Sequence, residues 1–285
     1  MKKYLIILAL FLPISVFAQS TEIKQKTDSI SVLFGAIVKA KSDEEKLSYN
    51  TKIEHIFSEL LQNKETFDYS FLELKFISKL KSDDDKLKIY TWNIPYENGT
   101  FEYFGFVQLK QKDESVALIE LTDKSKKIKT PEHKILYANN WYGALYYKLL
   151  TNSYKGKTYY TLLGWDGNDN FTNKKIIDVL TLKHKKIQFG SPVFKINNNE
   201  IKNRMIFEYA EQVKMMLRYD DKIKMIVFDH LAPEHPKFKG QYMYYGPDLS
   251  QDGFVFQEGL WLLKENLDLR NPDDGKDNKP IKTSF

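Results

Sequence analysis

Apolar residues between Ser20 and about Leu80 recur at helical spacing, and Gly35 is the only glycine in this stretch. Such spacing places the apolar side chains along one side of a helix. Ser42 followed by Glu45 is a capping-box pattern that starts a helix. The pattern therefore predicts two amphipathic helices packed on the rest of the protein. Their apolar stripes are Ile30, Leu33, Phe34, Ile37 and Val38, and then Ile53, Ile56, Phe57, Leu60 and Leu61.

Beyond residue 85 the pattern changes to short β-rich runs separated by turns that contain Asp, Gly or Asn. We expect strands over residues 87–93, 100–111 and 115–122, with the first hairpin turning at "ENGT" and another at "SYKGK". Three more strands are expected in "NRMIFEYAEQVKMMLRYDDKIKMIVFDHL", the last two joined at Asp220-Asp221. Between these groups, Thr172 is expected to cap one helix, "NKKIIDVLTL". The last third is expected to be rich in loops.

These elements predict a β-dominated α+β fold, an antiparallel meander or hairpin sheet with an N-terminal helical segment packed against it. We expect one globular domain over residues 19–270, helical over about 20–80 and β-rich over about 85–270, followed by a polar tail over 271–285. No Pro/Gly/Ser linker divides the parts near residue 85. A separate helical domain is the alternative.

The N-terminus has the pattern of a secretory signal peptide. The segment "MKKYLIILALFLPISVFAQS" has two lysines directly after Met1, and an apolar run extends from Tyr4 to Ala18. Because about 15 apolar residues are short for a membrane span of about 20, we predict cleavage after Ala18 and a periplasmic or secreted protein. The alternative is a signal-anchor helix. No second apolar stretch follows, so no transmembrane segment is expected after cleavage.

The amino-acid composition excludes several kinds of site and partner for this protein. The chain has no cysteine, which excludes disulfides, thiolate nucleophiles, Cys-ligated zinc and iron–sulfur clusters. Cleavage after Ala18 lowers the formal net charge from +5 to +3, since Lys2 and Lys3 are lost. The lysines are mixed with acids, as in "KSDDDKLK", and form no basic stripe. Nucleic acid is therefore not an expected partner.

Aromatic residues make up 14% of the chain, and two explanations apply. Large rings pack well on pleated sheets, and rings also stack on sugar faces. If a ligand binds, the candidate contact residues are Trp141, Tyr142, Trp165, Asp166 and Tyr244. Asp166 opens "DGNDN", which fits the first, third and fifth positions of a calcium loop. Phe171 and Ile177 stand where an EF-hand needs Gly and Glu, so a turn is favoured over a calcium or ligand loop.

Catalytic candidates are few. The segment "FDHLAPEHPKFKGQYMYYGPDLSQDGF" carries Asp229, His230, Asp248 and Asp252. Asp229 is a candidate to orient His230, with Asp248 and Asp252 as ligand or general base. The spacing of His230 and His235, broken by prolines, does not match a helical metal motif. No GxSxG, GxGxxG or P-loop pattern occurs, and no metal or other cofactor is expected.

The segments "SDDDKLKIYTWN", "YTLLGWDGND", "VFDHL" and "PDLSQDGF" resemble uncharacterised exported proteins of Bacteroidota-type bacteria over most of the mature chain. The resemblance implies an exported bacterial protein and no particular activity. Together these observations favour a non-catalytic protein that binds a small molecule, a glycan or an envelope protein. The alternative is a carboxylate- or metal-dependent hydrolase acting on an extracytoplasmic substrate such as a glycan.

Overall fold

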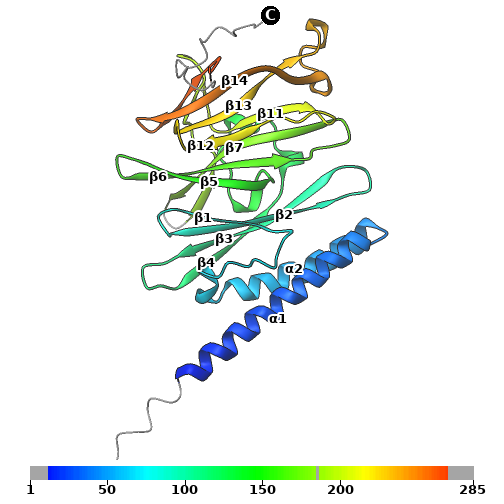
Figure 1. Ribbon diagram of the computed structural model, residues 1–285, viewed down its shortest axis with the longest axis vertical. Helices are drawn as coiled ribbons and strands as arrows, with labels where there is room; N and C mark the ends of the chain where they lie inside the picture. Colours follow the sequence, from blue (N-terminus) through cyan, green and yellow to red (C-terminus); the bar gives the residue numbers. More distant parts are fainter. Residues whose placement is uncertain (1–11, 184–185, 269–285) are drawn as a thin grey trace, which may run out of the picture.

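The computed structural model describes residues 12–183 and 186–268, with side chains from residue 21 onward (Figure 1). The first eleven residues of the predicted signal peptide and the predicted polar tail at 271–285 lie outside the described residues. The residues around the predicted cleavage site are described only as backbone within the first helix.

Two α-helices precede the sheets in the described chain, α1 (Leu12–Lys39) and α2 (Asp43–Leu61), as predicted. The Ser42 side chain accepts a hydrogen bond from the Glu45 amide at 3.2 Å and so caps α2. The Glu45 carboxylate accepts the Lys41 amide at 3.0 Å, one residue before the cap. Among the helices described, none is long and apolar enough to cross a membrane.

The described strands form three sheets, with every pairing antiparallel except that of β9 with β15. The first sheet has the order β1-β2-β3-β4, the second β11-β7-β6-β5 with β8 paired to β7, and the third β10-β9-β15-β14-β13-β12. The strand bounds are β1 Ser78–Lys81, β2 Leu87–Pro95, β3 Phe101–Lys110, β4 Val116–Thr122, β5 Leu145–Tyr154, β6 Lys157–Asp166, β7 Thr172–Lys183, β8 Lys186–Phe189, β9 Phe194–Lys195, β10 Ile201–Lys202, β11 Met205–Ala210, β12 Leu217–Asp220, β13 Met225–Pro233, β14 Tyr245–Gln257 and β15 Leu260–Lys264.

Short 3₁₀ turns join these elements. Their bounds are η1 Lys64–Phe67, η2 Ser125–Lys127, η3 Pro131–His133, η4 Ala138–Asn140, η5 Pro236–Phe238 and η6 Tyr242–Tyr244. The predicted hairpin turns at "ENGT", at "SYKGK" and after Asp220 are confirmed by the strand ends on either side of them.

The elements stack as four layers: the helical pair, the first sheet, the second sheet and the third sheet (Figure 1). One apolar core lies between the helices and the first sheet, and includes Phe57 and Trp92. A second core lies between the first and second sheets, and a third between the second and third sheets. The β-dominated α+β prediction, with the helical segment packed against a sheet, is confirmed.

Two local predictions are wrong. The expected helix "NKKIIDVLTL" is strand β7, which pairs with β6, β11 and β8. Its apolar residues are buried on both faces, Ile176 toward the first sheet and Ile177 toward the third, so the alternation that marks a half-exposed strand is missing. The last third, expected to be mostly loops, contains the 13-residue strand β14.

Candidate functional site

A cleft of about 770 Å³ opens at one end of the second sheet, and we call it the Trp165 cleft. Trp165 of β6 and Lys175 of β7 form part of its floor. Leu163 and Ile177 lie two residues from Trp165 and Lys175, respectively, and so point to the same face of the second sheet. Both are buried against the third sheet. The cleft therefore lies where the cover provided by the third sheet ends. Its lining is Gly99, Phe101, Trp165, Gly167, Asp169, Asn170, Asn173, Lys175, Tyr209, Glu211, Val213, Lys214 and Met215.

Strand pairing fixes the residues of the floor relative to one another. Trp165 lies directly opposite Lys175 on the neighbouring strand, and Asn173 lies opposite Tyr209 of β11. The Phe101 ring packs edge-on against Trp165, with ring centres 5.4 Å apart. Burial raises the pKa of Tyr209, and a hydrogen bond with the Trp165 side chain acts in the opposite direction. The floor is thus a fixed surface of rings and polar side chains on sheet strands.

The connection "DGNDN" between β6 and β7 forms one wall, and it joins two paired antiparallel strands, as a turn does. Asp166 is buried beneath the turn, where it accepts hydrogen bonds from the Tyr103 hydroxyl at 3.1 Å and the Asn168 amide at 2.8 Å. Burial raises the pKa of Asp166 despite these bonds. The Asp169 carboxylate accepts the amides of Phe171 and Thr172. Both carboxylates therefore hold the backbone of the turn.

Two glycines allow this wall to form. A Cβ atom on Gly167 would lie 2.3 Å from the Phe101 ring, so only glycine lets the turn pack against the ring. Gly99 has a φ of +80° and lies against the Asn170 amide, which donates a hydrogen bond to the Asn98 carbonyl at 3.0 Å. The turn after β6 and the hairpin turn after β2 are thus joined at the mouth of the cleft.

The loop between β11 and β12, residues 211–216, forms the opposite wall. Its first amide, from Glu211, donates to the Phe171 carbonyl at 2.9 Å. At its far end the Met216 amide donates to the Asp229 carboxylate at 2.7 Å, and the Asp229 amide donates back to the Met216 carbonyl at 3.1 Å. Gln251 donates to the other oxygen of Asp229 at 3.3 Å. Asp229, a predicted catalytic candidate, therefore positions this wall.

Several residues of the lining have polar atoms without a partner in the described parts of the chain. Asn170 and Asn173 use their amide NH₂ groups on the carbonyls of Asn98 and Glu211, which leaves their side-chain oxygens as acceptors. The Lys175 ammonium lies 4.8 Å from the centre of the Tyr147 ring. Burial lowers the pKa of Lys175, and no carboxylate opposes that effect.

The structure separates the ring residues that the sequence suggested. Trp165 lies in the cleft, but Trp141 is 0% exposed and Tyr142 4% exposed, in the core between the first and second sheets. The Trp141 indole donates to the Tyr146 hydroxyl at 3.0 Å. Tyr244 stacks on Phe238 with ring centres 4.1 Å apart and lines a smaller hollow of about 320 Å³. Trp141 and Tyr142 are therefore core residues and are not presented to a ligand.

Of the four catalytic candidates, His230 lies near Asp252 and Asp248, whereas Asp229 is engaged with the loop of residues 211–216. His230 bonds through Nδ1 to Asp252 at 2.7 Å, and the second oxygen of Asp252 accepts the Asn266 amide at 2.9 Å. The hydrogen bond to Asp252 is the main cause that raises the pKa of His230. Asp248 accepts the amide and hydroxyl of Ser250 in its own turn. In the described residues, no group of three or more His, Asp or Glu side chains is arranged to hold a metal ion.

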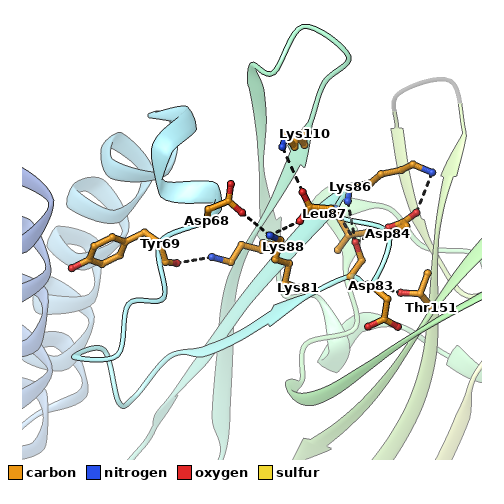
Figure 2. Close-up of polar contacts among 12 residues, drawn as sticks. Asp68, Tyr69, Lys81, Asp83, Asp84, Lys86, Leu87, Lys88, Lys110 and Thr151 are labelled. Atoms are coloured by element: carbon orange, nitrogen blue, oxygen red, sulfur yellow. Dashed lines mark hydrogen bonds and ion pairs between the residues drawn. The ribbon is translucent and has the colours of Figure 1, made fainter. Parts of the chain in front are cut away.

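A second charged cluster lies at the turn between β1 and β2 (Figure 2). Lys81 forms ion pairs with Asp68, at 2.6 Å, and with Asp85. Asp85 also forms an ion pair with Lys110. Lys88 donates to the Tyr69 carbonyl at 2.7 Å, and burial lowers its pKa to about 8. Because these groups satisfy one another or the backbone, the cluster holds the turn and the segment after α2 in place.

Most of the cleft was not found from the sequence. Lys175 and Asn173 lie in the segment expected to be a helix, so their position beside Trp165 could not be inferred. The β-branched residues of that segment, Ile176, Ile177, Val179 and Thr181, are the available signal for a strand. The sequence indicates Asn170 only as part of a turn or of a calcium or ligand loop, and nothing in it distinguishes Phe101 and Tyr209 as cleft rings from core rings.

Comparison with known proteins adds no identification. No protein-family model, curated protein or solved structure matches the chain. The function must therefore be argued from the geometry of the cleft.

Proposed function

We propose that this protein is an exported, non-catalytic binding protein that holds a carbohydrate in the Trp165 cleft. The observation that carries the proposal is the lining of the cleft, where the partly exposed Trp165 ring lies with the side-chain oxygens of Asn170 in the wall and Asn173 on the floor, neither of which has a partner among the described residues.

Carbohydrates combine the two surfaces that such a floor accommodates. One face of a sugar ring presents C–H bonds that pack on an aromatic ring, and the edge presents hydroxyl groups. Hydroxyls donate hydrogen bonds to amide oxygens and accept them from an ammonium group. A cleft of about 770 Å³ is within the range of small-ligand sites, about 300–1,000 Å³. Rings and amides on rigid strands need little reorganisation on binding.

The carboxylates of the cleft support binding over hydrolysis. A glycosidase uses two carboxyl groups on either side of the scissile bond. Here Asp169 is occupied by backbone amides, Asp166 is buried below the turn, and Glu211 is exposed at the rim. The alternative, a hydrolase built on Asp229, His230, Asp248 and Asp252, is supported by the His230–Asp252 pair and by the nearby Asp248, but Asp229 is bonded to the Met216 amide and Gln251.

The binding proposal is tested by intrinsic fluorescence with a panel of glycans and peptidoglycan fragments. We expect at least one of them to change the emission, and Trp165→Ala to weaken that binding by about tenfold, equivalent to 1.4 kcal/mol. Tyr244→Ala, which removes a ring from the separate hollow, is the control and should leave the affinity unchanged. A panel with no effect, or full affinity in Trp165→Ala, would refute the proposal.

Export rests on the N-terminal pattern of residues 1–18. N-terminal sequencing of protein recovered outside the cytoplasm should read from Gln19. Recovery of the intact N-terminus in a membrane fraction would favour the signal-anchor alternative.

A further inference from the structure

Lys175 is the unusual group of the Trp165 cleft. It is half-buried on the floor, and within the described residues it forms neither an ion pair nor a hydrogen bond. Its ammonium group lies over the face of the Tyr147 ring. Burying a cation without an opposite charge is unfavourable. The contact with the aromatic ring offsets only part of that cost.

The neighbouring lysine shows what this sheet does with a buried cation when a partner is present. Lys174 points to the opposite face of β7, where it donates to the Asn168 side chain at 2.7 Å and lies 3.8 Å from the Glu208 carboxylate. Lys175 has no equivalent partner in the described chain. Its charge remains available to a ligand.

None of the other charged residues of the described lining forms an ion pair with Lys175. Asp169 is engaged by two backbone amides. Glu211 and Lys214 are exposed at the rim and carry opposite charges. Over the whole lining Asp169 and Glu211 balance Lys175 and Lys214, but among the described residues the Lys175 ammonium on the floor has no ion-pair partner and can pair with one carboxylate of the ligand. A dianionic phosphate would bring a second negative charge toward Glu211.

We infer that the ligand is an acidic saccharide, whose carboxylate pairs with Lys175 while the sugar ring packs on Trp165. The inference rests on the proposed function. Because Trp165 and Lys175 are directly opposite each other on paired strands, their Cβ atoms are about 5 Å apart. A carboxylate attached to a sugar ring over the indole can therefore reach the ammonium group.

The experiment compares acidic saccharides, each with its carboxyl-reduced neutral counterpart, by titration calorimetry on the mature chain. The panel contains oligomers of uronic acid, sialic acid and muramic acid, and a sugar phosphate. We expect an acidic member to bind at least tenfold more tightly than its neutral counterpart, and this preference to decrease at high salt. Lys175→Met should abolish the preference, and Lys175→Arg should retain it.

Lys183→Met removes the same charge from the exposed end of the same strand and is the matched control, for which the preference should be unchanged. If neutral counterparts bind as well as the acidic saccharides, if the sugar phosphate binds best, or if folded Lys175→Met keeps the preference, the inference is overturned and the proposed function stands. If no saccharide binds, both are overturned.

Discussion

Glu54, Lys88 and Lys175 are all withdrawn from solvent without an ion pair in the described part of the chain, and each shows the cost of burying a charge. Burial raises the pKa of Glu54 to about 7, with Glu120 and Glu102 adding to the effect. It lowers the pKa of Lys88 to about 8 and lowers that of Lys175. Glu54 is bonded to Asn50, and Lys88 to a backbone carbonyl, whereas Lys175 faces an open cleft. This difference separates a structural group from a candidate binding group.

Glu54 should make the protein less stable as the pH rises. Its pKa in the fold, about 7, lies above the ordinary 4.5, so the folded state holds the proton more tightly than the unfolded chain. The stabilisation is complete below pH 4.5 and is lost as the pH rises to about 7. Glu54→Gln should therefore be more stable than the wild type at pH 8, on the order of 1 kcal/mol given partial solvent screening, and similar to it at pH 4.5.

Urea unfolding at the two pH values measures this difference. Glu44→Gln removes a charge from the exposed first turn of α2 and is the control, which should keep the wild-type fall in stability. If the free energy of unfolding changed equally with pH in wild type and Glu54→Gln, ionisation of Glu54 would not destabilise the fold.

The sequence supplied individual site residues only in part, for a physical reason. Trp165 was correctly placed at the end of a strand, yet Trp141 looked equivalent and is completely buried. Whether a ring faces a core or a cleft depends on where a neighbouring sheet stops, and that is set by contacts between residues far apart in the chain. Lys175 became visible as a site residue only when its strand was paired with that of Trp165.

At the scale of elements, segments bounded by clear turn residues or with clear periodicity are predicted correctly, including the buried strands β2 and β6, whereas the buried strand β7 is not. The helical pair, the hairpins of the first sheet and the β12–β13 hairpin have clear periodicity or clear turn residues, and all are present. Strand β7 is the central strand of the second sheet and is covered on both faces, so its apolar residues run consecutively. Consecutive apolar residues do not distinguish a buried strand from a helix.

The loop of residues 211–216 depends on one side chain from another element. Asp229→Ala removes the acceptor of the Met216 amide and of Gln251, leaving a partly buried donor without a partner. We expect a loss of about 1–3 kcal/mol in the free energy of unfolding and weaker ligand binding in the Trp165 cleft. Asp248→Ala removes an exposed carboxylate that bonds only within its own turn, and should change stability by about 0.5 kcal/mol or less.

Urea unfolding and the fluorescence titration would be run on both variants. Equal effects of the two substitutions would show that Asp229 does not anchor the loop. A loss of an enzymatic activity in Asp229→Ala, with stability retained, would instead support the hydrolase alternative.

At the scale of the whole molecule, the order of the layers was outside what the sequence could predict. A hairpin pattern indicates antiparallel strands, but it does not say how many sheets they form or which faces meet. The three sheets are joined by polar side chains as well as by apolar packing. One example is the turn between β1 and β2, where Asp84 accepts the Tyr160 hydroxyl at 2.9 Å. At the same turn the Asp83 amide donates to Thr151 at 3.0 Å (Figure 2).

The ion pair of Arg204 and Asp178 is the strongest candidate for such a connection. Both side chains are 0% exposed, and their closest atoms are 2.7 Å apart. Arg204 also donates to the Pro131 carbonyl at 2.7 Å, which ties the long connection between the first and second sheets to the strands behind it. Asp178 accepts the Val179 amide at 2.8 Å and lies 3.5 Å from the Tyr146 hydroxyl. Removing either charge leaves the other buried without compensation.

We therefore expect Arg204→Met and Asp178→Leu each to lower the free energy of unfolding by about 3–5 kcal/mol. The double variant should lose much less than the sum, because an apolar pair leaves no isolated charge between the sheets. Urea unfolding of the four proteins gives the coupling energy directly. Additive losses would mean that the two groups are stabilised separately by their backbone partners, and that the layers are held at this point by apolar packing alone.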